Sequence, residues 1–365
     1  MIPRCGTILR HPGEEFGKIV RGLRHGDIVR SVMGRGESVE PAGRGGSVIS
    51  LAGAVSAGVG LAVQSRLNGE LGSRVGDGIT ATLASTSVGL LLLLAIVPLF
   101  PAGRRGLGLV RAAVRTGGLR GWHLTGGVCG AVFVASQGIS VGSLGVAVFT
   151  VAVVGGSAVG GLIVDRFWGG DGTPRPITVA RTAGAAACVA AVAIAGNGAW
   201  GGSGTLALVI LPVFAGVAIA TQSALNGRVG AIAGSPWPAT LINFSVAAGS
   251  LALALVLRAG FGGALPGHLP AEPLLYLAGV IGMGVVAVAT TVVRRIGVLV
   301  FGLASVAGQL LGAVLLDALT PGPRPSAATF VGVAITFAAL VLAAHPRFRR
   351  SETVQDARLT ASRPR

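Results

Sequence analysis

Amide side chains recur in pairs along this sequence. Gln64 and Asn68 lie four residues apart, and the same spacing separates Gln222 from Asn226. Residues four apart share one face of a helix, so each pair can address the same neighbour. Because an uncharged amide both donates and accepts hydrogen bonds, this pattern suits recognition of polar groups on a small molecule. It equally suits a helix cap or a bond to a neighbouring helix.

Two further amides, Asn243 and Gln309, lie deeper within apolar runs. Polar side chains at depth in a membrane are costly and are functional candidates by default. Gln137, Ser85 and Thr86 also lie within such runs, where serine and threonine often bond their own helix backbone. The candidate substrate-binding residues are therefore six amides: Gln64, Asn68, Gln222, Asn226, Asn243 and Gln309.

The groups that catalysis or metal binding requires are missing from the apolar runs. No Asp or Glu lies in the middle of a run, and the five histidines lie at run edges or in the tails. The three cysteines have no metal-ligand spacing. No phosphate-binding loop that ends in Lys-Ser or Lys-Thr occurs. We therefore predict no catalytic residue, no metal site and no cofactor, and hence a protein that is not an enzyme.

The composition predicts an all-α membrane protein embedded in a lipid bilayer. Of the 365 residues, 52% are apolar and 12% are charged, whereas about 25% of an ordinary soluble chain is charged. Apolar runs long enough to cross a bilayer as helices recur along the chain, and strands of a membrane barrel would be shorter and would alternate. The ten predicted transmembrane helices are 47–66, 78–99, 121–141, 144–164, 177–196, 205–224, 237–258, 273–293, 297–317 and 326–344. Turn-rich separators, such as residues 101–105, lie between them.

The sequence contains an internal duplication. Gln64-Ser-Arg-Leu-Asn-Gly69 returns as Gln222-Ser-Ala-Leu-Asn-Gly227, at an offset of 158 residues. Further on the offset becomes 152 residues and aligns Leu144-Gly145 with Ile296-Gly297. The chain is therefore predicted to be a duplicated five-helix unit. Because five is odd, the second unit must be inserted upside down relative to the first.

Glycines spaced by four residues provide the predicted helix-packing faces. Gly156 and Gly160 form one such face, and Gly308 and Gly312 form its counterpart in the second unit. Small residues at this spacing let two membrane helices approach closely. We expect these four glycines to contact neighbouring helices.

An aspartate ends each of these glycine-containing helices, Asp165 in the first unit and Asp317 in the second. A carboxylate at a helix C-terminus opposes the macrodipole, so each needs a basic partner or water. Arg175 or Arg181 is the expected partner of Asp165, and Arg324 that of Asp317.

Basic residues are distributed unevenly between the two predicted sides of the membrane. The net charge is +16, and 25 of the 29 lysines and arginines fall in segments on the same side as the N-terminus. Since cytoplasmic loops are enriched in basic residues, both termini are predicted to be cytoplasmic. Aromatic residues make up only 5% of the chain, so it lacks the stacking platforms of a nucleic-acid-binding protein.

The expected organisation has four parts. Residues 1–45 are a basic, disordered extension, 46–200 the first five-helix repeat, 201–344 the inverted second repeat, and 345–365 a basic cytoplasmic tail. Met33 is a second plausible start.

The paired Q-S-x-L-N-G segments resemble the YdcZ-like family of the drug/metabolite transporter superfamily. Two further features share this resemblance: Trp122…Gly126-Gly127…Gly130 and the G-x-x-x-G…Asp segments. The resemblance covers residues 48–344 and implies ten helices, in which the G-x-x-x-G helices join the two repeats. It also implies export of small molecules across a prokaryotic inner membrane. The chain departs from the family pattern at Ser157, the repeat counterpart of Gln309.

Inverted repeats are typical of secondary transporters that open alternately to the two sides of the membrane. We therefore expect a multi-pass secondary transporter of the cytoplasmic (inner) membrane that exports a small metabolite or drug-like molecule. The alternatives are a small-solute channel, a scaffold without transport activity, and an intramembrane enzyme, for which the necessary residues are lacking. The sequence leaves open the substrate, the coupling ion, the direction of transport and whether the chain forms a homodimer.

Overall fold

A computed structural model of the chain describes residues 44–167, 203–261, 268–296, 298–319 and 327–344, together with residues 186, 187, 190 and 194. The chain divides into two units, residues 1–46 and 47–365, and apart from residues 44–46 the described residues belong to the second. The predictions for the two tails, including Met33, and for most of the helix at 177–196 fall outside the described residues.

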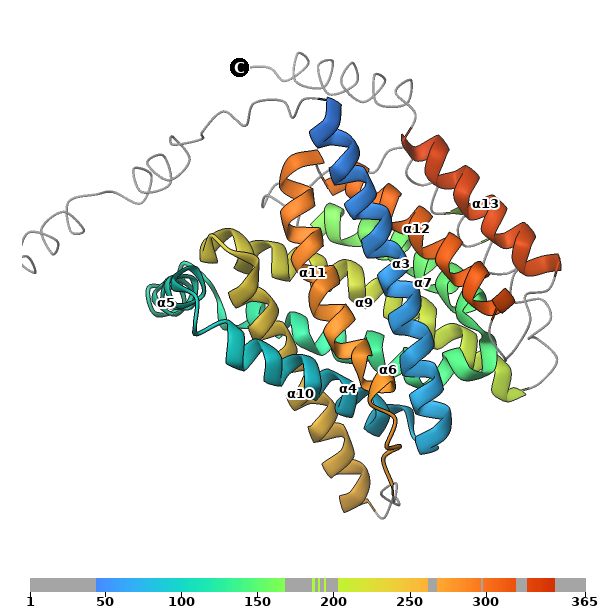
Figure 1. The fold of residues 1–365 in the computed structure, drawn as a ribbon, viewed down its shortest axis with the longest axis horizontal. Coiled ribbons are helices and arrows are strands. Elements are labelled where there is room, and N and C mark those ends of the chain that lie inside the picture. The colour runs from blue at the N-terminus through green and yellow to red at the C-terminus, as the bar shows by residue number, and fades with distance from the viewer. Residues whose placement is uncertain are drawn as a thin grey trace, which may run out of the picture. The chain divides into compact units, whose positions relative to one another are not determined.

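Helices account for nearly all of the described residues, and no strand occurs among them (Figure 1). The long helices are α3 (Arg44–Val75), α4 (Gly78–Ile96), α5 (Pro101–Arg115), α6 (Gly126–Leu144), α7 (Val146–Phe167), α9 (Ser203–Ala233), α10 (Pro236–Gly260), α11 (Leu277–Ile296), α12 (Val298–Leu319) and α13 (Ala327–Ala344). Short 3-10 helices, η1 (Gly121–Thr125) and η3 (Pro273–Tyr276), precede α6 and α11.

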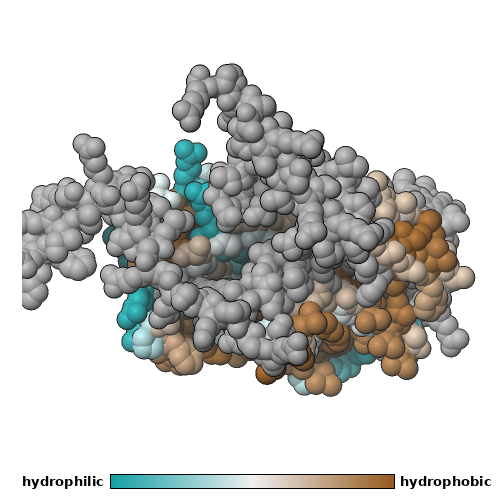
Figure 2. All heavy atoms as spheres, turned by 90° about the horizontal axis from the view of Figure 1, so that it is seen from above, coloured by the Kyte–Doolittle hydropathy of each residue, from teal (hydrophilic) through white to brown (hydrophobic). Residues whose placement is uncertain are grey.

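Six segments within the described residues are long and apolar enough to cross a membrane. They are Val48–Val75, Gly78–Leu99, Gly121–Leu144, Val146–Val164, Leu208–Ala233 and Pro236–Gly260, and shorter apolar helices occupy Pro273–Ala289 and Ala304–Leu319. Large apolar side chains such as Leu91, Phe214 and Val256 are exposed on these helices, and Figure 2 shows apolar residues in broad surface patches. The prediction of an all-helical membrane protein is confirmed.

The first helix of each repeat is longer than expected. α3 continues to Val75 and α9 to Ala233, whereas the drop in hydropathy had placed their ends near residues 66 and 224. In α3 the polar end is stabilised as helix because Glu70 pairs with Arg66 and Arg74 one turn away on either side, at 3.7 and 2.7 Å. The paired amides therefore lie inside the helices, which removes the interpretation that they cap helix ends.

The separator expected between the second and third spans forms the amphipathic helix α5 instead. Pro101 opens it at a position where the missing N–H costs nothing. Its buried side consists of Gly103, Gly106 and Val110, and Val110 packs with Val229 of α9. The arginines of α5 are all exposed, and the helix lies at the edge of the bundle in Figure 1. It was missed because short amphipathic helices rich in arginine and glycine have the composition of loops.

The helix boundaries follow the two sequence offsets. α3 and α9 end 158 residues apart, and α4 and α10 begin 158 residues apart. α7 and α12 both begin and end 152 residues apart. The glycine that terminates the first helix has a positive φ in both repeats, 71° at Gly76 and 63° at Gly234, a conformation that glycine adopts without strain. The duplication is thus present in the backbone as well as in the sequence.

The two repeats pack on one another reciprocally. A Cβ added to Gly156 of α7 would overlap the carbonyl oxygen of Val213 in α9, and one added to Gly308 of α12 would overlap that of Val55 in α3. These are equivalent contacts, because the offsets convert each pair into the other. α7 of the first repeat therefore lies against α9 of the second, and α12 of the second lies against α3 of the first, backbone on backbone. Gly160 and Gly312 extend these contacts to Val217 and Val59.

Leucine at Gly156 or Gly308 tests this packing. The side chain needs space that the neighbouring backbone occupies, and overpacking of this kind costs ~1–3 kcal/mol. We expect both variants to have a lower Tm in detergent than the parent protein. The matched control is Gly161→Leu on α7, where an added Cβ meets no atom within 4 Å. Equal Tm values for all three variants would contradict the backbone contact.

Candidate substrate cavity

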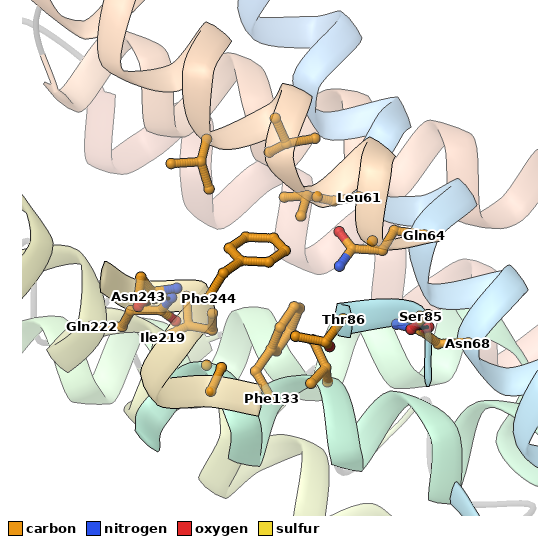
Figure 3. A pocket seen from close by; sticks show the side chains of 17 residues that line it. Leu61, Gln64, Asn68, Ser85, Thr86, Phe133, Ile219, Gln222, Asn243 and Phe244 are labelled. Carbon is orange, nitrogen blue, oxygen red and sulfur yellow. Dashed lines mark hydrogen bonds between the residues drawn. The ribbon is translucent and has the colours of Figure 1, made fainter. Parts of the chain in front are cut away.

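A cavity of about 100 Å³ lies between the two repeats (Figure 3). Helices α3, α4 and α6 of the first repeat and α9, α10 and α11 of the second contribute to it. Its polar lining consists of Gln64, Asn68, Ser85, Thr86, Gln222 and Asn243, and its larger apolar lining residues include Leu61, Phe133, Ile219 and Phe244.

Glycines make room for the two glutamines. A Cβ added to Gly282 of α11 would lie 2.9 Å from Nε2 of Gln64, and one added to Gly130 of α6 would lie 3.1 Å from Nε2 of Gln222. Gly130 and Gly282 are repeat counterparts, as are the two glutamines. Each glutamine therefore fits beside a glycine of the opposite repeat, and both sides of the cavity depend on residues from both repeats.

A buried hydrogen-bond network fixes Asn68 in the first repeat. Its Nδ2 donates to Oε1 of Gln137 at 2.7 Å, and its Oδ1 accepts from the Ser85 hydroxyl at 2.8 Å. Nε2 of Gln137 in turn donates to Oγ of Ser65 at 2.8 Å. Asn68 is 1% exposed and Gln137 is fully buried. These bonds join α3, α4 and α6, so the amide of Asn68 holds helices together as well as lining the cavity.

A different network occupies the equivalent place in the second repeat. Nε2 of Gln222 and Nδ2 of Asn226 both donate to Oδ1 of Asn243, at 3.0 and 3.1 Å. Asn243 is the repeat counterpart of Ser85 and joins α9 to α10. Since Nε2 of Gln222 is fixed by this bond, Oε1 is the end of its amide that remains for another donor.

The structure places four of the six candidate amides in the cavity lining: Gln64, Asn68, Gln222 and Asn243. Asn226 is not a lining residue, but its Nδ2 donates a hydrogen bond to Asn243, which is one. Gln309 is buried in α12 beside Gly58 of α3, at the contact between the repeats.

Sequence reasoning did not identify the aromatic residues Phe133 and Phe244 as cavity residues, because phenylalanine in an apolar run is indistinguishable from lipid-facing or core residues. Phe244 directly follows Asn243, and this adjacency was the available signal.

Asp317 has a partner that the sequence did not suggest. Its carboxylate accepts hydrogen bonds from the backbone N–H groups of Val146 and Ala147, at 2.9 and 2.6 Å, and it is 5% exposed. The carboxylate thus caps the N-terminus of α7 across the repeats, a position that favours negative charge. Arg324, the expected partner, and the side chain of Asp165 fall outside the described set.

Two ion pairs join the repeats at the end of the bundle where α3 meets α4. Asp77 receives hydrogen bonds from both terminal nitrogens of Arg258 at 2.9 Å each, and Arg74 bonds Glu272 at 2.9 Å. Asp77 also caps α4 by accepting from the backbone N–H groups of Ile79 and Thr80. Burial alone would raise the pKa of Asp77, but the bonds from Arg258 and Thr80 outweigh it, so its pKa lies below the ordinary value.

This geometry defines a class of protein: a helical membrane protein whose two similar halves surround an uncharged cavity lined by amides. The chain belongs to the family described as "Putative inner membrane exporter, YdcZ", whose sequence pattern matches residues 49–194 and again residues 207–342. The predicted family is confirmed, and the two matches coincide with the two repeats. The protein is thus a multi-pass inner-membrane protein of an exporter family, which is not a class of enzymes. Comparison with curated proteins and with solved structures gives no match.

The two amides of α3, Gln64 and Asn68, have different expected roles. Asn68→Leu leaves the buried Oε1 of Gln137 without its donor, at a cost of about 1–3 kcal/mol. It also removes the shorter of the two bonds of the Ser85 hydroxyl, which keeps the carbonyl of Thr82 as its acceptor. Gln64→Leu breaks no side-chain hydrogen bond that occurs within the described part of the chain. We therefore expect Asn68→Leu to lower the Tm in detergent clearly more than Gln64→Leu. The reverse order would show that the Asn68 network contributes little to stability.

Proposed function

We propose that the protein is a secondary transporter that exports a small molecule by alternating access. In this proposal, ten helices form two inverted five-helix repeats, both termini are cytoplasmic, and the cavity binds the transported molecule. The observation that carries the proposal is the position of the cavity, which is lined in equivalent ways by both repeats. A site at such an interface changes its access when the repeats rock against one another.

Contacts between helix ends support the inverted orientation. The positive-inside topology puts the end of α3 and the end of α10 on the outer side, and Asp77 and Arg258 at these ends form an ion pair. The same topology puts the end of α12 and the start of α7 on the outer side, where Asp317 bonds Val146. On the inner side it puts α5 beside the end of α9, in agreement with their packing. Parallel repeats would place the members of each pair on opposite sides of the membrane.

The two ends of the bundle are closed by different interactions. At the outer end, ion pairs link the repeats through Asp77 with Arg258 and Arg74 with Glu272. The repeat counterparts of Asp77, Arg258 and Glu272 are Ser235, Phe100 and Arg120, which cannot form these pairs. We propose that the charged contacts form a gate that holds the outer end closed in this conformation, whereas apolar packing of α5 serves the inner end.

Transport itself can be tested in a deletion strain that is grown against a panel of toxic compounds and metabolites. A compound that becomes more toxic on deletion is then followed in proteoliposomes. Alternating access predicts saturable uptake and counterflow of labelled compound against its gradient. Linear uptake without counterflow would favour a channel, and the absence of uptake for every compound in the panel would contradict transport.

The topology can be measured by cysteine labelling in a background without the native cysteines. Ala112 on α5 and Ala271 before η3 are both exposed, and the proposed orientation puts them on opposite sides of the membrane. We expect a membrane-impermeant thiol reagent to label Ala271→Cys from outside intact cells and Ala112→Cys only after permeabilisation. Labelling of both from the same side would contradict the inverted arrangement.

The outer gate can be weakened without loss of the helix cap. Asp77→Asn removes the charge that binds Arg258, but asparagine still caps α4. Because partly exposed ion pairs contribute modestly, we expect a several-fold increase in labelling of a cysteine at Thr86 from outside. Arg258→Gln should have the same effect, and the double variant should add little more.

The pH dependence of this gate follows from the lowered pKa of Asp77. A depressed carboxyl pKa contributes to closure at pH values above its ordinary range and loses that contribution as pH falls through the lowered pKa. External labelling of the Thr86→Cys protein is compared at each pH with that of the Thr86→Cys, Asp77→Asn protein, because the reactivity of the thiol itself depends on pH. The difference between the two proteins should be constant around neutral pH and disappear only below about pH 4.

A further inference from the structure

We infer that the cavity binds a small, uncharged molecule with a flat apolar body and hydrogen-bond donors on two opposite sides. The inference rests on the proposed function, because it takes the cavity as the site of the transported molecule. It concerns which chemical class of molecule the side chains of this chain can hold.

Two carbonyl oxygens in the cavity lining are left without donors. Oε1 of Gln64 and Oε1 of Gln222 are buried, and neither accepts a hydrogen bond from any described residue. Gln64 is 6% exposed and Gln222 is half-buried. Neither oxygen itself is reached by solvent in this conformation, so a donor meets it when the glutamine side chain turns toward the cavity. A buried acceptor without a partner costs free energy, and an N–H or O–H group of a bound molecule would remove that cost. Because the two glutamines are repeat counterparts, each repeat contributes one acceptor oxygen without a donor to the cavity.

Aromatic rings lie between these two acceptors. In Figure 3, Gln64 and Gln222 lie on opposite sides of the cavity, and the side chains of Phe133 and Phe244 project between them. Both rings are at least nine-tenths buried. Aromatic side chains favour offset-stacked or edge-on contact with other flat rings, so the middle of the ligand is expected to be flat and apolar.

The cavity lining excludes charged ligands. None of its side chains is ionisable in the neutral pH range, and a charge taken from water into such a place without a partner is strongly disfavoured. The volume of about 100 Å³ is somewhat below the ~150 Å³ of an engineered cavity that takes up benzene. Because the cavity is partly open, a single ring whose substituents extend beyond the enclosed volume is the largest ligand that this conformation accepts.

Resorcinol, a benzene ring with two hydroxyl groups, is a suitable probe, and 1,3-dimethoxybenzene is its matched analogue without donors. Binding of both to the purified protein in detergent is measured by calorimetry, along with benzoate and benzylammonium as charged analogues. Each neutral hydrogen bond contributes roughly 2- to 10-fold in affinity. We therefore expect resorcinol to bind at least several-fold more tightly than 1,3-dimethoxybenzene, and both charged analogues to bind more weakly than resorcinol.

Variants assign the effect to the two acceptors. Gln64→Leu and Gln222→Leu should each reduce resorcinol affinity roughly 2- to 10-fold and leave the affinity for 1,3-dimethoxybenzene unchanged. Ser223→Ala is the control. Ser223 directly follows Gln222 on α9, is exposed, and donates its hydrogen bond to the carbonyl of Ile219 in the same helix. Gln222→Glu should admit benzylammonium, a gain that loss of folding cannot mimic.

Equal affinities for resorcinol and 1,3-dimethoxybenzene, absence of resorcinol binding, or tighter binding of a charged analogue would each overturn this ligand class. The counterflow measurement tests transport separately. If a compound from the growth panel shows counterflow while resorcinol fails to bind, the ligand class is wrong and the transporter stands. If no compound shows counterflow but resorcinol binds through both glutamines, the cavity is a binding site of the inferred class in a protein that does not transport.

Discussion

Direct contact between the backbones of the two repeats is the constraint on which the rest of the structure depends. In a bilayer the lipid tails are as apolar as leucine, so helices associate through close packing and hydrogen bonds instead of hydrophobic burial. Gly127 of α6 lies against the backbone of α10, and its counterpart Gly279 of α11 lies against that of α4. Three residues further along the same faces, Gly130 and Gly282 meet glutamine side chains instead. The contact that joins the repeats thus also places the cavity one helical turn away.

The duplicated halves have diverged in how they satisfy their amides. Asn68 is bonded to Gln137 and Ser85, whereas its counterpart Asn226 shares the oxygen of Asn243 with Gln222. The position equivalent to Gln137 is Ala289, so the second repeat cannot form the first network. The first repeat therefore has a more fully bonded set of amides, and within the described residues Gln64 and Gln222 each keep a buried oxygen without a donor. Symmetry of the backbone coexists with asymmetry in the polar interior.

The helical fold, the duplication and the family were predictable because each leaves a periodic or repeated signal in the sequence. The extent of α3 was not, since Glu70 and Arg74 read as a polar boundary although their pairing one turn apart keeps the chain helical. For the cavity, the amides were recognisable by type and spacing, but whether an amide faces the cavity or a neighbouring helix depends on how the helices are rotated. Gln309 and Gln64 have the same chemistry in sequence, and only the packing of α12 against α3 separates them. The partner of Asp317 lies 171 residues away, a distance at which local sequence carries no information.

The bond from Asp317 to the start of α7 has a consequence for how the protein is made. Ribosomal synthesis delivers α7 long before α12, so the first two amides of α7 wait for an acceptor that does not yet exist. Bare N–H groups are costly in a membrane, and an incomplete chain therefore carries a defect at the elbow between α6 and α7 that only its last third can repair. The first half is therefore completed only together with the second, because Val146 and Ala147 obtain their acceptor when Asp317 has been made.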